Sequence, residues 1–453
     1  MLVVLGVAAM AALASCSSDD AEDVNVGATD GGTDAATVHD GADAQDQDGS
    51  PSRDGGDTRD AAWFDGGPLP VDCSGAGPCA TALVTTLGAS ASDLGEGFCA
   101  LLHDGTVACW GANLAGQLGR GDQANAFDSA TPARVVGVEN ATQIDHTCVR
   151  TATGEVFCWG TGPFLRGDAG AASTERTALK LPLPPVTRVA AGADVACALA
   201  DDGLLCWGRN TNGQLAPLES TPAYTALPPK RLELPSGGRA RDVVLGAAAF
   251  VLRDDGETLS WGANPPLARV SPLFPDPHPL PVTLAGISSL DVTIDSACAT
   301  AGGTGYCWGA TIPKVGEIVA TNPPALDRAL PERVDAPEPL VQIATTRTLT
   351  STDFGDPVIR PQRWCAVSAT GKVYCWGYNA SGQAGDGTKS YAFEAKLVQG
   401  LPAPAVTVKT TPSTTCALLT TGRVHCWGAN FYGQLGNGKI KVPSLTPQEV
   451  MLP

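Results

Sequence analysis

The chain has 453 residues and a net charge of −18, and this charge is unevenly spread. The segment from Cys16 to Asp72 holds fourteen Asp, one Glu and two Arg, a net charge of −13, which leaves −5 for the rest of the chain. No basic cluster occurs anywhere. Because binding to a phosphate backbone needs one, the composition argues against a nucleic-acid partner. Fifteen Cys in a chain of this length favour an oxidising compartment outside the cytosol.

Residues 1–15 are predicted to be a lipoprotein signal peptide. Residues 1–12 are almost wholly apolar and are followed by Leu-Ala-Ser-Cys16. The stretch is shorter than the ~20 residues of a membrane-spanning helix. The four residues resemble a bacterial lipobox, in which the Cys becomes an acylated N-terminus, so we expect a lipid anchor on Cys16. Ser17 and Ser18 resemble an outer-membrane sorting signal. An ordinary cleaved signal peptide with a chance Cys is the alternative. In one respect the segment departs from any signal sequence, because no Lys or Arg precedes Cys16.

Residues 16–72 are predicted to be an acidic, disordered linker. Asp, Gly, Ala, Ser and Thr dominate the segment, and large apolar residues are rare. Such a composition cannot bury enough apolar surface to offset the entropy cost of ordering. The acidic residues also fit a calcium loop poorly, because Ala44 and Gly55 occupy the first and last ligand positions of the best alignment. We therefore expect no metal ion and no cofactor here.

Residues 73–453 are predicted to form one domain built from seven repeats, each marked by the dipeptide Trp-Gly. In the best-preserved copies, residues 99–111 and 416–428, a Cys-Ala-Leu-Leu run leads through a turn ending in Gly to Cys-Trp-Gly. A glycine at the end of a short turn is typical of a β-hairpin. The seven repeat tryptophans are Trp110, Trp159, Trp207, Trp261, Trp308, Trp376 and Trp427.

The hairpins place two Cys of each repeat directly opposite one another. Opposed residues on antiparallel strands have Cα atoms about 4.5 to 5.5 Å apart, which a disulfide tolerates. The fourth repeat has Phe250 and Ser260 in the two places, so both partners are missing together, as a bond within one repeat predicts. Buried free thiols and a metal site are the alternatives, although the spacing lacks the short separation of zinc ligands. The expected disulfides are Cys73–Cys79, Cys99–Cys109, Cys148–Cys158, Cys197–Cys206, Cys298–Cys307, Cys365–Cys375 and Cys416–Cys426.

Four repeats continue after Trp-Gly with Asn and Gly-Gln, as in residues 112–119 and 429–436. This Trp-Gly-x-Asn-x-x-Gly-Gln-Leu-Gly pattern resembles the repeat of the regulator-of-chromosome-condensation family. The resemblance implies an all-β fold, a seven-bladed β-propeller whose blades are four-stranded antiparallel sheets. No strand-like run precedes Cys99, whereas residues 447–452 at the C-terminus are strand-like. We therefore expect that final strand to complete the first blade and close the ring.

The longest interval between repeat tryptophans, from Trp308 to Trp376, contains two insertions. One, residues 322–339, is rich in Pro. The other, residues 345–363, combines an aromatic residue with charges of both signs, which suits an exposed binding interface. A solvated loop without a partner is the alternative. The predicted binding residues are Asp353, Phe354, Asp356, Arg360 and Arg363.

The sequence offers little catalytic chemistry. No two of its five histidines recur at a metal-ligand spacing, and no nucleophile, zinc-protease or phosphate-loop motif is present. His146 and His425 fall in predicted strands and His278 in a predicted loop. We therefore predict a non-catalytic binding or scaffold protein of the cell envelope that recognises a protein or a glycan. An extracytoplasmic hydrolase or lyase using loop residues is one alternative. Guanine nucleotide exchange, which the family resemblance also implies, is another and would need a cytosolic or nuclear GTPase.

Overall fold

The computed structural model describes residues 64, 66–88, 95–121, 127–167, 171–215, 226–309, 329–351, 358–360 and 362–453. These residues belong to one compact unit, Ala62–Pro453. The signal peptide, Cys16 and the acidic linker up to residue 63 lie outside the described residues, so the predictions made for them stay predictions. Among the described residues, no helix is long and apolar enough to cross a membrane.

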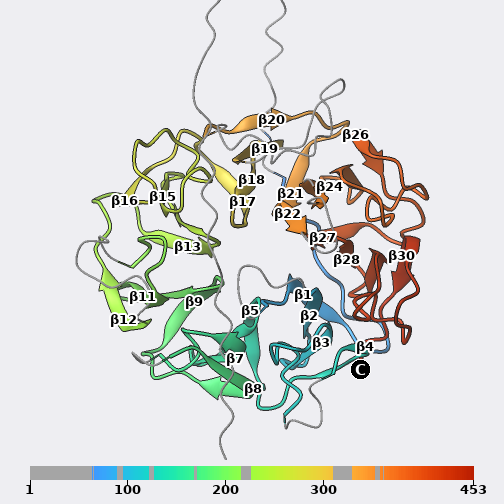
Figure 1. The fold of residues 1–453 in the computed structure, drawn as a ribbon, viewed down its shortest axis with the longest axis horizontal. Coiled ribbons are helices and arrows are strands. Elements are labelled where there is room, and N and C mark those ends of the chain that lie inside the picture. The colour runs from blue at the N-terminus through green and yellow to red at the C-terminus, as the bar shows by residue number, and fades with distance from the viewer. Residues whose placement is uncertain are drawn as a thin grey trace, which may run out of the picture. The chain divides into compact units, whose positions relative to one another are not determined.

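The unit is a closed ring of seven four-stranded antiparallel sheets, blades 1 to 7 in chain order, as Figure 1 shows. This confirms the predicted all-β, seven-bladed propeller. Blades 1 to 4 consist of β1 (Ala80–Thr85), β2 (Gly97–Leu102), β3 (Val107–Gly111) and β4 (Ser129–Arg134); β5 (Ala141–Asp145), β6 (Cys148–Thr151), β7 (Val156–Gly162) and β8 (Ser173–Lys180); β9 (Val186–Ala191), β10 (Val195–Ala200), β11 (Gly203–Arg209) and β12 (Ala226–Leu232); and β13 (Ala240–Leu245), β14 (Ala248–Arg253), β15 (Thr258–Gly262) and β16 (Asp276–Pro281).

The remaining blades follow the same plan, with one insertion in blade 6. Blades 5 to 7 consist of β17 (Ile287–Val292), β18 (Ser296–Ala301), β19 (Thr304–Gly309) and β20 (Glu332–Val334); β21 (Leu340–Thr345), β24 (Arg363–Ser368), β25 (Val373–Gly377) and β26 (Ala392–Leu397); and β27 (Ala405–Thr410), β28 (Thr414–Leu419), β29 (Val424–Gly428) and β30 (Ser444–Glu449). The insertion is a two-stranded hairpin, β22 (Leu349–Ser351) with β23 (Val358–Arg360).

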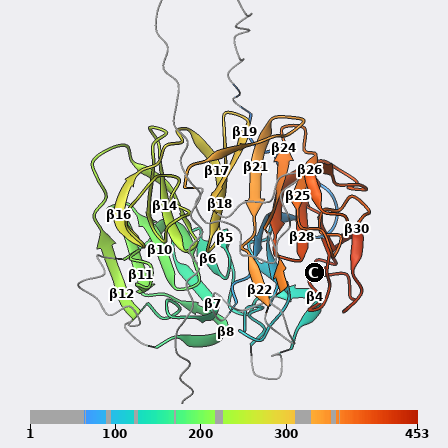
Figure 2. The ribbon, with the colours of Figure 1, turned by 45° about the horizontal axis from the view of Figure 1, so that its top comes forward.

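The first strand of each blade lies nearest the ring axis, and the strands run from one face of the ring to the other (Figures 1 and 2). We call one face the loop face: it carries the connections from first to second strand and from third to fourth strand of every blade. The opposite face, the turn face, carries the hairpin turns between second and third strands and the links between blades. The two faces therefore receive different parts of the same repeat.

The predicted hairpin register and disulfides are confirmed. Cys99 pairs with Cys109 across β2 and β3, with Cα atoms 4.1 Å apart. All six within-repeat bonds and Cys73–Cys79 are formed. In blade 4, Phe250 pairs with Ser260 at the equivalent position, and the Phe250 ring packs against Trp308 of the next blade. An aromatic ring thus fills the place that a disulfide occupies elsewhere.

The seven repeat tryptophans are buried, as expected for core residues, and six of them bond to the neighbouring blade in the described part of the chain. The Trp159 indole donates to the main-chain oxygen of Gln117 in the preceding blade, at 2.9 Å. Side chains of the motif build the loop that presents this oxygen: Asn113 accepts from the Leu118 amide at 3.1 Å, and Gln117 from the Ala115 amide at 2.9 Å. The same indole-to-oxygen bond links Trp110 to Gln434, Trp207 to Phe164, Trp261 to Gln214, Trp308 to Pro266 and Trp427 to Gln383.

The predicted closure of the ring by a C-terminal strand in blade 1 is wrong. β30 pairs with β29 inside blade 7, and blade 1 has its own innermost strand, β1, which pairs with β2. The ring closes instead through contacts between complete blades: the Ala80 amide donates to the Gly422 oxygen at 2.9 Å, and Trp110 to Gln434 at 3.0 Å. β1 escaped prediction because the connection 86–96 separates it from the Cys-Ala-Leu-Leu run by more residues than in the other repeats except the sixth, where residues 346–362 intervene.

Candidate functional site

Large apolar side chains are exposed on the loop face of blades 1 and 7. Leu114 is 82% exposed, Phe127 81% and Phe431 61%. The blade 7 loop contacts blade 1, because the Gly438 amide donates to the oxygen of Ala130 in β4 at 3.0 Å. Several large apolar side chains exposed on one face of a soluble domain are a feature of binding sites. We call this group the blade 7–1 patch; its members are Leu114, Phe127, Phe431, Ile440 and Val442.

The repeat motif itself directs these side chains outward. Asn430 turns inward, where its oxygen accepts from the Leu435 amide at 3.0 Å and its amide donates to the Lys439 oxygen at 2.7 Å. The residue that follows the Asn, Phe431, therefore faces solvent. The equivalent position in blade 1 is Leu114. Exposed Lys439 and Lys441 flank the patch and give it a basic edge.

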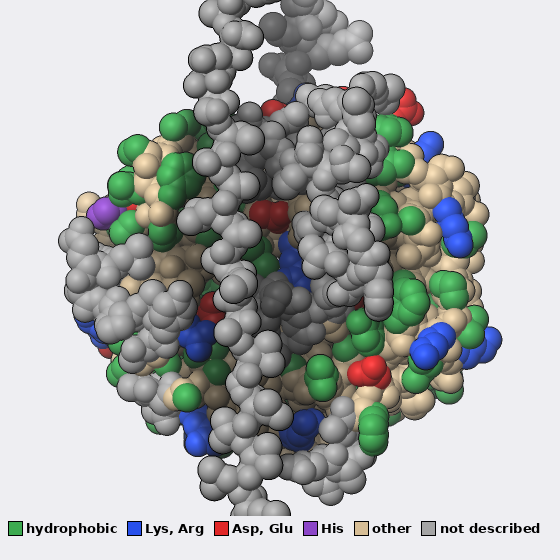
Figure 3. All heavy atoms as spheres, viewed as in Figure 1, with side chains coloured by type: hydrophobic (Ala, Val, Ile, Leu, Met, Phe, Trp, Pro, Cys, Tyr) green, Lys and Arg blue, Asp and Glu red, His purple; other side chains and the backbone are tan. Residues whose placement is uncertain are grey.

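A second apolar group lies on the loop between β15 and β16 of blade 4, where Val270, Leu273 and Phe274 are exposed. Figure 3 shows hydrophobic side chains on several blades around the central opening. A buried ion pair supports this loop: Arg269 Nη1 lies 2.7 Å from Asp276 Oδ2. Burial alone raises the pKa of Asp276, but hydrogen bonds from Arg269, Ser271 and His278 outweigh it and hold the pKa at about 2.

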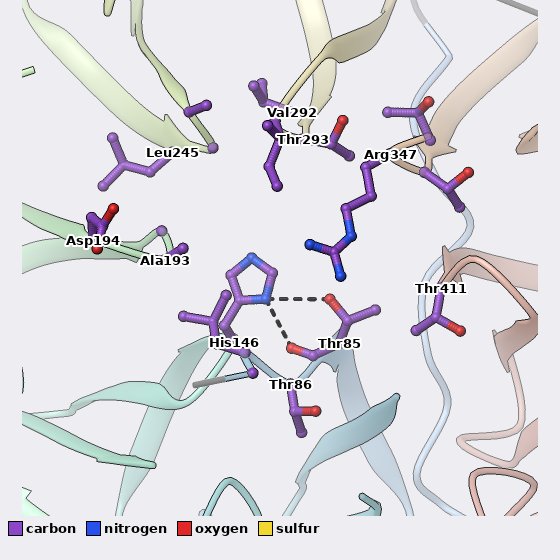
Figure 4. Close-up of a pocket in the computed structure, with 18 of the residues that line it drawn as sticks. Thr85, Thr86, His146, Ala193, Asp194, Leu245, Val292, Thr293, Arg347 and Thr411 are labelled. Carbon is purple, nitrogen blue, oxygen red and sulfur yellow. Dashed lines mark hydrogen bonds between the residues drawn. The ribbon is translucent and has the colours of Figure 1, made fainter. Parts of the chain in front are cut away.

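A cavity of about 400 Å³ opens at the ring axis, near the ends of the innermost strands (Figure 4). Every blade contributes to its wall, and threonine hydroxyls and aliphatic side chains predominate. Its volume is within the ~300–1,000 Å³ of typical small-ligand sites. One lining residue from each blade in turn is Thr85, His146, Asp194, Leu245, Thr293, Thr345 and Thr411.

The two carboxylates that line the cavity already have protein partners. Glu96 accepts hydrogen bonds from the Thr411 hydroxyl at 2.6 Å and the Ser413 amide at 2.9 Å, which join blade 1 to blade 7. Asp194 lies 3.3 Å from Arg209 of its own blade. Both carboxylates therefore contribute to holding the ring and its loops.

An adjoining cavity of about 220 Å³ is lined by charged residues of the innermost strands. Lys409 Nζ lies 3.1 Å from Asp291 Oδ1. Burial lowers the pKa of Lys409, but the Asp291 carboxylate outweighs burial and raises it. Burial raises the pKa of Asp242. Asp145 accepts from the Ala191 amide at 2.8 Å. The Lys409–Asp291 pair joins blade 7 to blade 5, and Asp145 joins blade 2 to blade 3. The described residues include no cluster of three His, Cys, Asp or Glu that could hold a metal ion.

The structure does not support Arg363 as an exposed binding residue, so that prediction is wrong. Arg363 begins β24 and is 1% exposed. Its guanidinium donates to the Thr411 oxygen at 2.6 Å and the Thr415 hydroxyl at 2.8 Å, which ties blade 6 to blade 7. Burial lowers its pKa to about 9, opposed by the charge of Glu96. Asp353, Phe354 and Asp356 lie outside the described residues, and the side chain of Arg360, the last residue of β23, does too.

Sequence reasoning also missed the axial residues. The prediction that His146 lies in a strand is wrong, because it lies in the turn between β5 and β6. Away from the axis, the prediction that His278 lies in a loop is also wrong, because it lies in β16. One signal was available: Glu96, Asp194 and Asp295 all stand three residues before the first Cys of a repeat. That position follows the innermost strand, which brings it to the loop face near the axis.

The ring of hairpin-stapled blades joined by indole-to-oxygen bonds defines the class of this protein as a seven-bladed repeat propeller. The family model "Regulator of chromosome condensation (RCC1) repeat" matches residues 186–214, 365–383 and 407–434, and a second RCC1 repeat model matches residues 421–453. The matches fall in blades 3, 6 and 7, so the chain carries RCC1 repeats and resembles the propellers built from them.

Relatives identified by sequence agree. The chain is 27% identical to the ultraviolet-B receptor UVR8 of Arabidopsis thaliana over 375 residues, which are 75% of this chain and 76% of the receptor. It is 25% identical to the human E3 ubiquitin-protein ligase HERC2 over 301 residues, which are 65% of this chain but only 5% of HERC2.

Solved structures share the fold. Yeast RCC1 (Prp20), in its complex with Kap60, superposes with a TM-score of 0.60 at 18% identity, covering 77% of this chain and 84% of that one. Human WBSCR16 superposes with a TM-score of 0.58 at 18% identity, covering 76% and 94%. At these identities the likeness establishes the architecture and nothing about ligands.

Proposed function

We propose that this protein is a non-catalytic binding or scaffold propeller that recognises a protein or a glycan through its loop face. The exposure of Leu114, Phe127 and Phe431 carries the proposal, because apolar side chains of this size gain free energy when a partner covers them. They stand on loops that are free to vary while the blades remain rigid. Protein binding has precedent among structural neighbours: yeast RCC1 was solved bound to Kap60, and Prp20p was studied for its binding to Gsp1p and histones.

We further propose that the propeller works outside the cytoplasm, held at the outer membrane by a lipid on Cys16. The Leu-Ala-Ser-Cys16 sequence supports the anchor. The seven disulfides support an oxidising compartment, because cytosolic thiols are kept reduced. In this proposal the acidic segment 16–72 is a spacer between the membrane and the binding domain.

The binding proposal is tested by capture from an envelope extract of the native host, with the full chain immobilised. The double variant Leu114→Ser, Phe431→Ser removes two members of the blade 7–1 patch. The matched control is Arg134→Ser at the end of β4, whose exposed ion pair with Asp104 is expected to contribute little.

We expect wild type and Arg134→Ser to capture the same partner, and the double variant to lose about tenfold or more of its affinity. Protease treatment of the extract abolishes capture if the partner is a protein, and periodate oxidation abolishes it if the partner is a glycan. Equal capture by all three chains would refute the loop face as the binding surface.

The anchoring proposal is tested by mass spectrometry of the protein purified from its host. The expected N-terminus is an acylated Cys16, and Cys16→Ser should leave the chain unacylated. An N-terminus at any other residue would overturn the lipid anchor without affecting the proposed binding face.

A further inference from the structure

The loop between β15 and β16 of blade 4, residues 263–275, has a wholly apolar exposed part on the loop face. Val270 and Phe274 are each 75% exposed. The one charged residue of the loop, Arg269, is buried. Figure 3 shows hydrophobic side chains gathered where Figure 1 places β15 and β16. We call the exposed part of this loop the blade 4 tip; its members are Val270, Pro272, Leu273 and Phe274.

Polar side chains beneath the blade 4 tip hold it in place without a partner. Arg269 Nη1 lies 2.7 Å from Asp276 Oδ2, and both side chains are buried. The Ser271 hydroxyl donates to the same carboxylate oxygen at 2.8 Å. The Asn264 side-chain amide donates to the Leu273 oxygen at 2.9 Å. Because the tip is already ordered, little conformational entropy is lost when something binds it.

The same contacts satisfy main-chain polar groups that an apolar medium would penalise. The Asn264 side chain also donates to the Ser271 oxygen at 3.1 Å, and the Leu273 amide donates to the Ser271 hydroxyl at 3.1 Å. Pro272 and Pro275 have no amide hydrogen. An unsatisfied backbone group is costly in lipid, so a loop enters a bilayer at low cost only where such groups are paired or missing. The blade 4 tip meets this requirement at these positions.

Size and chemistry favour a bilayer over a protein as the partner of this tip. A stable protein interface buries about 800 Å² on each partner and carries about one hydrogen bond per 100–200 Å². The tip has only four exposed residues, and none of them has a polar side chain. A bilayer needs neither a matching shape nor hydrogen bonds, and binding to it strengthens with each apolar side chain that is buried. Because the tip exposes no charge, it does not select an anionic lipid.

We propose that the blade 4 tip enters the interface of a phospholipid bilayer, to a depth of about 5–10 Å, as a second membrane contact of a tethered chain. The tip alone binds lipid weakly, but a tether keeps the ring where the local lipid concentration is high. The contact presupposes the membrane tether proposed above and uses none of the residues of the blade 7–1 patch. Figure 1 places β16 across the ring axis from β30. A ring tilted onto the blade 4 tip therefore leaves the blade 7–1 patch open to a partner.

The test is fluorescence quenching on vesicles of phosphatidylcholine with bromine in its acyl chains. The chain from Cys16 to its C-terminus is held on the vesicles by an N-terminal His tag and a nickel-chelating lipid, which replace the proposed anchor. Phe274→Trp puts a reporter in the blade 4 tip. The matched control is Ala152→Trp, at an exposed position in the turn between β6 and β7 on the turn face. The wild type gives the background from the native tryptophans, and far-UV circular dichroism confirms that each variant is folded.

The fluorescence added by Phe274→Trp should fall at least about twofold on brominated vesicles, whereas that added by Ala152→Trp should not change. Adding Val270→Asp and Leu273→Asp to the Phe274→Trp chain should abolish the quenching, because charged side chains are costly in lipid. Raising the salt concentration to about 0.5 M should leave the quenching unchanged, because no exposed charge of the tip takes part.

Three results would overturn the proposal. The first is equal quenching of Phe274→Trp and Ala152→Trp. The second is quenching of Phe431→Trp without quenching of Phe274→Trp, which would assign the membrane contact to the blade 7–1 patch. The third is a tip that lipid does not quench but that an envelope extract shields from iodide, which would assign it to a protein. Because the vesicle tether is not the lipid on Cys16, these results do not depend on whether Cys16 is acylated.

Discussion

The turn face and the loop face carry different parts of the same repeat, and these parts differ in how strongly they are constrained. On the turn face, hairpin turns are short and their oxygens accept the amide that begins the next blade: Ala141 donates to Gly105, Val186 to Gly154 and Ala405 to Gly371, at 2.8 to 2.9 Å. On the loop face, the connections from third to fourth strands differ in length and sequence and expose residues such as Leu114 and Phe431.

The difference shows where the repeat is constrained. Turn-face residues make main-chain bonds between blades, so a change there disturbs the ring. On the loop face, the indole-to-oxygen bond requires only a main-chain oxygen, which any residue supplies. Phe164 and Pro266 provide it in blades whose Asn and Gly-Gln pattern is lost. The loop tips are therefore free to acquire binding residues while the ring is maintained.

The largest expected effect is on the turn face. Gly422 has a φ of +71°, and a Cβ there would overlap Cys79 Sγ. Gly422→Ala should lower the free energy of unfolding by about 3 kcal/mol, from backbone strain and steric overlap at the ring closure. The control is Gly387→Ala on the loop face, with a φ of +81° and no atom within 4 Å, which should cost about 1 kcal/mol. Equal losses in denaturant titrations would remove the distinction between the faces.

The disulfides staple the hairpins that connect the two faces. Replacing both Cys365 and Cys375 with Ala opens a bond that spans ten residues. The expected loss is about 2–3 kcal/mol, mainly because the unfolded chain gains entropy. The measurement is again denaturant unfolding. A variant as stable as wild type would mean that packing alone holds the hairpin, as it does around Phe250 in blade 4.

Low pH should selectively weaken the loop between β15 and β16 of blade 4, which the Arg269–Asp276 ion pair supports. Asp276 has a pKa of about 2, below its ordinary 3.8, so its stabilisation is complete above about pH 4 and is lost as the pH falls through about 2. The pH-dependent part amounts to about 2 kcal/mol. Asp276→Asn should lower stability at neutral pH and flatten this part of the pH profile. Glu338 also has a pKa of about 2, but it contributes equally to the pH dependence of stability in the wild type and in Asp276→Asn. If the stability of Asp276→Asn changed with pH in the same way as that of the wild type, the assignment of this pH dependence to Asp276 would be contradicted.

The smallest effect is expected at a loop tip. Leu114→Ser removes an apolar side chain that is mostly in water, so the free energy of unfolding should change by less than about 0.5 kcal/mol. Thermal unfolding checks this expectation. A decrease in the free energy of unfolding of more than about 1 kcal/mol would show that Leu114 packs against the folded ring, which would argue against its role in binding a partner.

The blades were predictable because the residues that determine each hairpin lie close together in the sequence. The turn glycines Gly105 and Gly422 do have positive φ, and the two Cys of each hairpin are about ten residues apart, so their register follows from neighbouring residues. Ring closure was not predictable, because β1 pairs across a long connection and carries no repeat motif. The predicted interface failed at Arg363 because a charged residue beside an insertion resembles a loop residue, whereas its partners, such as Thr411 and Thr415, lie about fifty positions away.

The axial cavity was the least predictable feature. Its lining residues, among them His146, Asp194 and Thr411, belong to different repeats, and no shared spacing in the sequence connects them. Only the closed ring brings them to one space.

Hydrogen exchange of the full chain tests the contrast between the faces most directly. If the turn face holds the ring, the amides of Ala80, Ala141, Val186 and Ala405, which donate across blade junctions, should exchange among the slowest in the protein. Amides at the exposed tips around Leu114 and Phe431 should exchange orders of magnitude faster. Junction amides that exchange as fast as the loop tips would contradict the account.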